Sequence, residues 1–334
     1  MEQRERPKRN RRWLLWTAAG LCAALLIFRL GFGIYYREFY SLSAREFTIP
    51  GLNENFVPQG LEACGDGNYL VSGYISTTGA ARLYYVSRGG SVRMIRVRRE
   101  GGGTLKSHSG GICTNGPFTY LAGGNGNCYV LSSADLFDPT SHSADVRGVL
   151  RTDNAASFCY LADGHLLVGE YEYGRFRTAA SHHITTPAGD RNTAVILAYP
   201  LDGDQPFGVV STPDGAYSIP PRAQGMCFTD DGRLVLSASS FRNSSQLFLY
   251  DFAAVQKSRQ GIFWTGGTPV PLYHLDSGVC VGTIPLPPYS EETVFEKGRL
   301  FILFESASSR FRFGRLVGGQ YVYSMRLPEW EGDA

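Results

Sequence analysis

Residues 224–237 read QGMCFTDDGRLVLS, which is an apolar run, an Asp-Asp-Gly turn and a second apolar run. An Asp-Gly pair between two alternating apolar runs is a strong signal for a β-hairpin, because glycine accepts the positive φ that the tight turn needs. The stretch therefore predicts two antiparallel strands joined by a short turn. It decides the fold because the same pattern recurs along the chain.

The hairpin pattern is found at four other places. The turn glycines of the five copies are Gly67, Gly116, Gly164, Gly232 and Gly298, separated by 49, 48, 68 and 66 residues. A period near 48 with two enlarged steps is in the range of propeller blades. A third apolar strand follows each hairpin, so each copy supplies most of a four-stranded antiparallel sheet.

We therefore expect an all-β protein, a β-propeller with five visible repeats. A sixth blade would have to lie in the two long gaps, near residues 207–219 and 270–285. Regular units with short turns, and no helical pattern between them, favour the propeller over a β-sandwich or a solenoid.

The charge distribution separates the N-terminus from the rest of the chain. The net charge is +2, but the first twelve residues carry six basic and two acidic side chains, so the remainder has a net charge of −2. The globular part shows no bias toward a polyanion, and we expect no nucleic-acid partner.

The N-terminal region predicts a membrane anchor. Residues 13–28 are uncharged and apolar, Arg29 interrupts the run, and residues 30–36 continue it. A helix over 13–36 is long enough to cross a bilayer if Arg29 reaches the headgroups. Tryptophans lie near its N-terminal end and tyrosines near its C-terminal end, and such rings favour the membrane interface. The basic tail, residues 1–12, should stay in the cytoplasm and the rest outside the cell membrane. The alternative is a signal peptide cleaved after Ser41-Leu42-Ser43, before Ala44.

The remaining chain divides into three parts by the same patterns. Residues 37–58 are a polar connector, 59–327 the propeller and 328–334 an acidic C-terminal tail. Residues 47–49 are a candidate closing strand for the last blade.

Cysteines recur in the repeats. Cys22 lies in the predicted anchor, and the propeller holds Cys64, Cys113, Cys128, Cys159, Cys227 and Cys280. One interpretation is that small, soft side chains fill crowded inner strands. The other is a disulfide between neighbours, which the even count and an oxidising compartment permit.

Familiar catalytic motifs are missing from the sequence, which contains no Gly-x-Ser-x-Gly, His-Glu-x-x-His or phosphate-binding glycine loop. The repeat nevertheless predicts where a site would lie. The turns gather at one end of the axis, and residues that begin the first strand or follow the second gather at the other. The ligand-binding candidates there are His108, Asn154, Glu170, Gln224, Arg242, Glu292, Glu305 and Arg310.

These candidates allow more than one chemistry. A ring of acids, Glu170, Glu292 and Glu305, would suit calcium, with His108 as a base or a further ligand. The same groups would also bind sugar hydroxyls. Arg310 or Arg312 would pair with Glu305, because burying that acid alone is costly. Gln59 and Gln224 precede glycine at strand starts, which favours a structural bond to the neighbouring blade.

The repeats over residues 59–327 resemble those of gluconolactonase-like, NHL and YVTN-type extracytoplasmic propellers. Residues 109–112 (SGGI), 223–226 (AQGM) and 303–307 (LFESA) are also similar to segments of membrane-anchored or secreted bacterial propellers. The resemblance implies a propeller outside the cytoplasm. In its lactonase-like branch it implies six blades and a central calcium held by acidic and amide residues.

Three functions remain open at this point. The leading interpretation is a membrane-anchored propeller that binds a small molecule, a glycan or a protein at the funnel-shaped end of its axis. The second is a calcium-dependent, lactonase-like hydrolase, and the third is a scaffold in an envelope complex. Fold alone does not choose among them.

Overall fold

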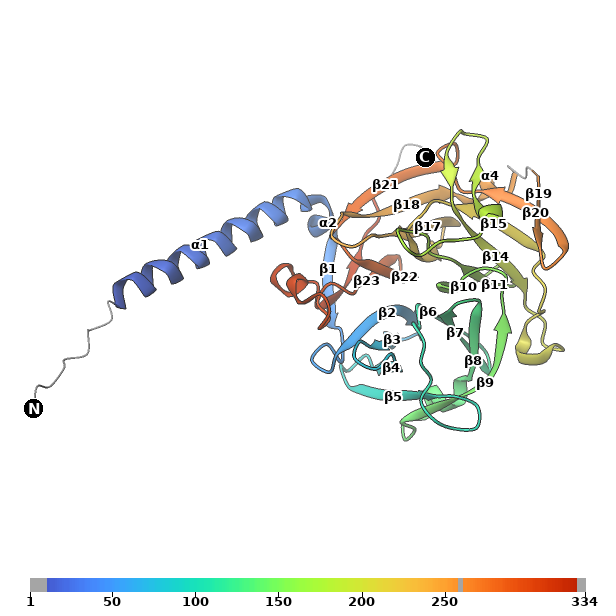
Figure 1. The fold of residues 1–334 in the computed structure, drawn as a ribbon, viewed down its shortest axis with the longest axis horizontal. Helices are drawn as coiled ribbons and strands as arrows, with labels where there is room; N and C mark the ends of the chain where they lie inside the picture. Colours follow the sequence, from blue (N-terminus) through green and yellow to red (C-terminus); the bar gives the residue numbers. More distant parts are fainter. Residues whose placement is uncertain (1–10, 258–260, 329–334) are drawn as a thin grey trace, which may run out of the picture.

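The computed structural model describes residues 11–257 and 261–328. Within these residues, five four-stranded antiparallel blades surround one axis (Figure 1). The innermost strand of each blade contacts the innermost strands on either side, so the five close a ring. In ring order they are β2 (Phe56–Ala63), β6 (Gly111–Asn115), β10 (Phe158–Ala162), β16 (Ala223–Phe228) and β22 (Ser290–Glu296). The fold is a β-propeller, as the sequence predicted.

Each blade continues outward through three more strands. Blade 1 has β3 (Tyr69–Ile75), β4 (Ala81–Val86) and β5 (Val92–Arg98); blade 2 has β7 (Phe118–Gly124), β8 (Asn127–Ser132) and β9 (Ser143–Arg151); blade 3 has β11 (His165–Gly169), β14 (Ala194–Pro200) and β15 (Gly215–Ile219); blade 4 has β17 (Arg233–Ala238), β18 (Ser245–Asp251) and β21 (Cys280–Leu286); blade 5 has β23 (Arg299–Phe304), β24 (Tyr321–Met325) and β1 (Ser43–Thr48).

The outer strands also pair between units. Strand β5 runs parallel to β9 and joins blades 1 and 2 at their outer edges. Strand β15 pairs in parallel with β20 (Thr268–His274), which forms a hairpin with β19 (Ile262–Thr265). A second small hairpin, β12 (Ile184–Thr185) with β13 (Arg191–Asn192), belongs to the long insertion of blade 3.

The predicted turns form by the expected backbone geometry. Asp163 and Gly164 have φ of 48° and 72° between β10 and β11, and both central residues of a type I′ turn need positive φ. The middle strands are covered on both faces, because each blade packs between two others. All seven residues of β3 are buried for this reason, and the strand reads as a nearly continuous apolar run.

The long gaps in the repeat hold outer strands and no sixth blade within the described residues. The first gap ends in β15, the outermost strand of blade 3, and the second contains β20 and β21. The expectation of six blades from the lactonase-like resemblance is therefore corrected to five. The N-terminal segment closes the ring, since Phe47 and Thr48 of β1 pair with Val322 and Tyr321 of β24. Strand β1 thus brings part of the predicted connector, residues 37–58, into the propeller.

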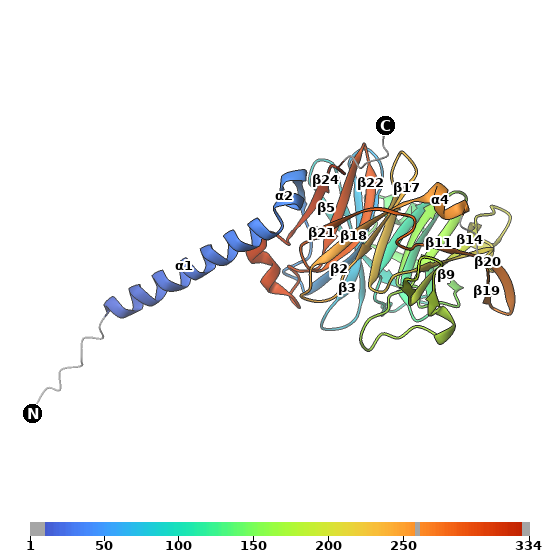
Figure 2. The ribbon, with the colours of Figure 1, turned by 90° about the horizontal axis from the view of Figure 1, so that it is seen from above.

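Two helices precede the propeller. Helix α1 (Arg11–Tyr35) leaves the rim of the ring beside blade 5 (Figures 1 and 2). Its segment Trp13–Tyr35 has 23 residues and a mean hydropathy of 1.8, and its most apolar stretch is unburied, as suits a membrane anchor or a signal sequence. Helix α2 (Arg37–Leu42) follows and inserts Phe39, which is 0% exposed, against Phe304 and Tyr323 of blade 5.

Short helical segments lie in the connections. They are α3 (Ser133–Phe137), α4 (Phe252–Lys257), η1 (Ala180–His182), η2 (Pro206–Gly208) and η3 (Arg312–Val317). Segment η3, in the loop between β23 and β24, contacts α1. The predictions for the basic tail and the acidic C-terminus fall largely on residues 1–10 and 329–334, outside the described part of the chain.

Candidate ligand-binding site

Two glutamines tie blade 5 to its neighbours at the end of the axis opposite the Asp-Gly turns. Gln59 of β2 donates from Nε2 to Glu305 Oε2 at 3.0 Å, and Gln224 of β16 donates from Nε2 to Glu291 Oε1 at 3.2 Å. The predicted structural bond from each glutamine to a neighbouring blade is therefore confirmed. Glu291 is 2% exposed and Glu305 is half-buried, so the two acids lie at the base of this end.

Three further side chains complete what we call the axial mouth, defined by Tyr74, His108, Gln224, Glu291, Glu305 and Arg310. Arg310 donates from its guanidinium to the Tyr74 hydroxyl at 2.8 Å, and the Tyr74 and His108 rings lie 5.1 Å apart. His108 is open to solvent but has protein on most sides, as in a recess. The structure thus gathers four predicted candidates, His108, Gln224, Glu305 and Arg310, in one place.

Burial and neighbouring charges shift the pKa values of the ionisable groups in the axial mouth. Burial raises the pKa of Glu305 to about 8 although Arg310 and Gln59 oppose the shift. Burial and then the nearby Glu305 raise the pKa of Glu291 well above its usual range. Burial and then Arg310 lower the pKa of His108 to about 4. Burial therefore favours the neutral forms of Glu291, Glu305 and His108 beside the Arg310 guanidinium.

Two more exposed arginines surround the axial mouth. Arg242, Arg310 and Glu305 lie close enough to Tyr289 to interact electrostatically with its hydroxyl group. Arg222, Glu291 and Glu305 interact in the same way with the hydroxyl group of Tyr171. The Arg222 guanidinium lies 4.9 Å from the centre of the Tyr173 ring. These two arginines therefore add positive charge around the axial mouth.

Glu292 closes the axis just inside the mouth. Its Oε2 accepts a hydrogen bond from the Ile112 amide at 3.3 Å, and its Oε1 is buried with no partner. A Cβ on Gly225 would lie 2.6 Å from the Glu292 Cα, so the backbone approaches too closely for any other residue there. Burial raises the Glu292 pKa well above its usual range. Glu292, a predicted ligand-binding candidate, is therefore buried inside the axis and does not face solvent.

Two other predicted candidates lie inside blade 3. Glu170 accepts from Val195 N at 3.1 Å and Ala155 N at 3.2 Å, and its Oε1 lies 2.6 Å from His182 Nδ1. Asn154 donates to the carbonyls of Val168 and Val195 at 2.7 and 3.2 Å. Both side chains bond the strands and loops of their own blade. His182, the partner of Glu170, stands in a long insertion, and nothing in its sequence neighbourhood indicates that role.

The predicted calcium ligands are not brought together. Among the described residues, no group of three or more histidine, cysteine, aspartate or glutamate side chains is placed to hold a metal ion. Glu170 is held by His182, Glu292 points to Ile112, and Glu305 faces Gln59. Glu170, Glu292 and Glu305 therefore do not form the acidic calcium site that the sequence suggested.

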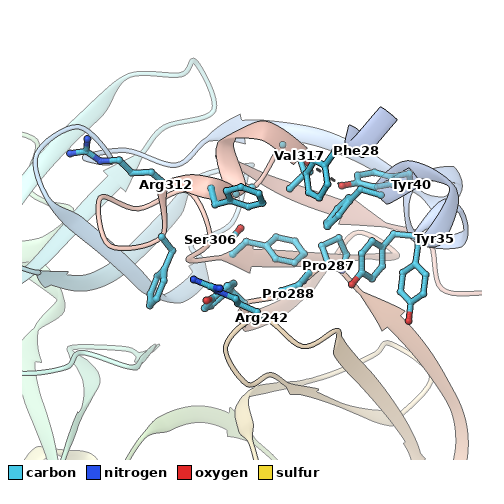
Figure 3. A pocket seen from close by; sticks show the side chains of 18 of the residues that line it. Phe28, Tyr35, Tyr40, Arg242, Pro287, Pro288, Ser306, Arg312 and Val317 are labelled. Atoms are coloured by element: carbon cyan, nitrogen blue, oxygen red, sulfur yellow. Dashed lines mark hydrogen bonds between the residues drawn. The ribbon is translucent and has the colours of Figure 1, made fainter. Parts of the chain in front are cut away.

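A cavity of about 760 Å³ lies next to the axial mouth, between α1, α2 and blade 5 (Figure 3). One wall comes from α1 through Phe28 and neighbouring residues, and the other from blade 5 and η3, including Val317. Its charged and polar lining includes Arg242, Ser306, Arg310 and Arg312. We call it the rim cavity. Sequence reasoning missed it because its walls are some 280 residues apart along the chain. Of its lining residues, Arg242 and Arg310 were among the predicted ligand-binding candidates.

The seven cysteines all lie in the described residues and are free. Cys113, Cys128 and Cys159 share the apolar core between blades 2 and 3, and the sulfur atoms of Cys113 and Cys159 lie 3.6 Å apart. The structure thus follows the packing interpretation of these cysteines, in which soft side chains fill the crowded inner strands.

Comparison with known proteins adds little beyond the architecture. No protein-family model and no curated protein matches the chain. Solved structures similar to it include glutaminyl cyclase from Myxococcus xanthus, with 13% identity, a TM-score of 0.43 and coverage of 85% of this chain and 94% of that one. The PQQ-bound aldose sugar dehydrogenase from Streptomyces coelicolor has 15% identity and a TM-score of 0.43, with 78% and 76% covered.

A third similar structure is a putative oxidoreductase (glucose dehydrogenase) from Thermus thermophilus. It has 13% identity and a TM-score of 0.42, with 86% of this chain and 99% of that one covered. Likeness at this level carries no argument about activity. The strand pairing described above defines the class, a five-bladed β-propeller with an apolar N-terminal helix.

Proposed function

We propose that this chain is a single-pass membrane protein whose extracytoplasmic propeller binds a small organic anion at the axial mouth. The observation that carries the proposal is the placement of Arg310, an exposed guanidinium that donates to the neutral Tyr74 hydroxyl and forms no ion pair among the described residues. Burial raises the pKa values of the nearby Glu291 and Glu305, which favours their neutral forms and leaves less negative charge opposite Arg310. A guanidinium presents two parallel donors that match a carboxylate or a phosphate.

The packing of α2 supports an anchor over a cleaved signal peptide. Cleavage before Ala44 would remove Tyr36 and Phe39, which are buried in one core cluster with Phe304 and Tyr323. The Tyr36 hydroxyl also lies 2.8 Å from the Ser244 hydroxyl of blade 4. A signal peptide has no reason to complete the core of the mature domain. The basic residues before α1 favour a cytoplasmic N-terminus, with the propeller on the other side.

Isothermal titration calorimetry on the full chain in a non-ionic detergent tests the binding. The probes are inorganic phosphate, glycerol 3-phosphate and citrate, at pH 7. We expect at least one to bind, and Arg310→Gln to weaken that binding by at least about tenfold, because it removes a charge-assisted hydrogen bond. The matched control is Arg96→Gln, an exposed arginine on β5 of blade 1. Binding by none of the probes, or equal binding by both variants, would contradict the proposal.

The pH dependence of the affinity for the anion provides a second test. Above pH 8 Glu305 ionises, so it offsets Arg310 and repels an anion, and binding should weaken. Glu305→Gln mimics the protonated acid and should keep its affinity through that range. An affinity that falls equally in both proteins would show that Glu305 does not control the charge of the mouth.

A further inference from the structure

We infer that the rim cavity takes the apolar chain of an amphiphile from the outer leaflet, whose phosphate or carboxylate group binds at Arg310 of the axial mouth and at the neighbouring Arg242. The inference rests on the proposed function and names its ligand class. It follows from three features: a cavity wall that belongs to the proposed membrane span, a part of the propeller that lies at the same depth, and the charged and apolar side chains that line the cavity.

The first feature is that part of the cavity wall belongs to the proposed membrane span. Phe28, Gly31 and Phe32 line the cavity and lie within Trp13–Tyr35. At a rise of about 1.5 Å per residue, Phe28 lies about 10 Å along the helix from Tyr35. The span is only slightly longer than a hydrocarbon core of about 30 Å needs. With Tyr35 at the outer interface, Phe28 therefore lies at the depth of the outer acyl chains.

The second feature is that the propeller reaches the same depth. Phe313 of η3 is 65% exposed, and its ring centre lies 5.4 Å from that of Phe28. Segment η3 contacts α1, and Figure 2 shows the red coil of this segment beside the helix at the rim. An exposed aromatic ring is favourable at a membrane interface and unfavourable in water. The cavity between α1 and η3 is thus bordered by lipid.

The third feature is that the lining is both charged and apolar. Arg242, Arg310 and Arg312 supply its guanidinium groups, and aromatic rings such as Phe32 and Phe304 supply its apolar surface. Figure 3 shows Phe28 and Tyr40 from the helical segment facing Ser306 and Arg242 across the same space. A volume of about 760 Å³ is in the range of pockets that enclose organic ligands. A charged head with an apolar tail matches this lining.

Native mass spectrometry of the full chain, released from a non-ionic detergent, tests the inference with three probes. They are 1-palmitoyl lysophosphatidic acid, glycerol 3-phosphate, which has the same head without a chain, and monopalmitin, which has the chain without a phosphate. We expect lysophosphatidic acid to bind at least about tenfold more tightly than either of the others, because both ends of the ligand are then bound.

The key variant is Gly31→Phe, and its matched control is Gly33→Phe on the same helix. A Cβ at either glycine meets no atom within 4 Å, but only Gly31 lines the cavity. We expect Gly31→Phe to lose at least about tenfold in affinity for lysophosphatidic acid and none for glycerol 3-phosphate, because the new ring fills the space for the chain. Gly33→Phe should bind both as the parent protein does.

The outcomes separate this inference from the proposed function. If glycerol 3-phosphate binds and the palmitoyl chain adds nothing, or if the two glycine variants behave alike, the rim cavity holds no acyl chain although the anion site stands. If monopalmitin binds as tightly as lysophosphatidic acid, the head is not anionic. If no probe binds, the lipid ligand is overturned together with the anion site.

Discussion

The carboxylate of Glu292 in β22 accepts a hydrogen bond from the amide of Ile112 in β6, with Oε2 and N 3.3 Å apart. These strands are not neighbours in the ring, because β2 lies between them. The bond therefore spans the centre of the propeller and ties blade 5 to blade 2. Gly111 lies at the same crossing, where an added Cβ would be 2.8 Å from Glu292 Oε2, the oxygen that accepts from Ile112.

Glu292→Ala should destabilise the propeller much more than Glu292→Gln. Alanine leaves a cavity and an unpaired Ile112 amide, for a loss of about 2–4 kcal/mol in the free energy of unfolding. Glutamine keeps the volume and an acceptor oxygen, and it resembles the protonated acid that the raised pKa implies. Thermal unfolding of the full chain in detergent measures both, with the exposed Glu100→Ala as a control. Equal midpoints for the alanine and glutamine variants would mean that the cross-axis bond does not hold the blades.

Gly225→Ala should also lower the stability, by about 1–3 kcal/mol, because the new Cβ would meet the Glu292 backbone at 2.6 Å and the inner strands would have to move apart. The control is Gly215→Ala in β15, where the nearest atom to a new Cβ is at 3.7 Å, an ordinary contact. Chemical denaturation of the two variants compares them. A Gly225→Ala protein as stable as its control would show that the ring has room at its centre.

Stability should fall as the pH rises from about 4.5 to about 8. Burial raises the pKa values of Glu62 and Glu305 from 4.5 to about 8 in the folded chain. The folded state therefore binds more protons than the unfolded state in this range, and the free energy of unfolding decreases with pH. Glu62→Gln and Glu305→Gln remove one titration each and should flatten the curve of unfolding midpoint against pH. A midpoint that rises over this interval in the parent, or a slope that neither variant changes, would contradict the assignment.

Phe39→Ala should destabilise the propeller although Phe39 lies outside its blades. The side chain is fully buried against Phe304 and Tyr323, and deleting a buried phenylalanine costs about 3–5 kcal/mol. The matched control is Phe137→Ala in α3, where the ring is 39% exposed. Thermal unfolding in detergent reports the difference. If the two variants melt alike, α2 does not belong to the folded domain, and the argument against a cleaved signal peptide fails.

Much of the architecture could be predicted because its signals are local. The Asp163-Gly164 turn depends on two adjacent residues, and so does each repeat of the hairpin. The same repeat predicts that His108, Glu305 and Arg310 lie at one end of the axis, because they precede a first strand or follow a second one. The sixth blade was a wrong alternative, because an outer strand such as β15 reads like the start of a new unit until its pairing with β14 is seen.

The sequence by itself determined the strands, their turns, the apolar helix and the end of the axis where polar residues gather. Each of these follows from the period of apolar residues or from backbone conformation over a few positions. Only the tertiary structure decided that Glu170 bonds to His182, that Glu292 closes the axis, and that Phe28 and Phe313 lie together at the edge of the rim cavity. Such contacts depend on how blades and helix pack across long stretches of chain, and no local pattern encodes that packing.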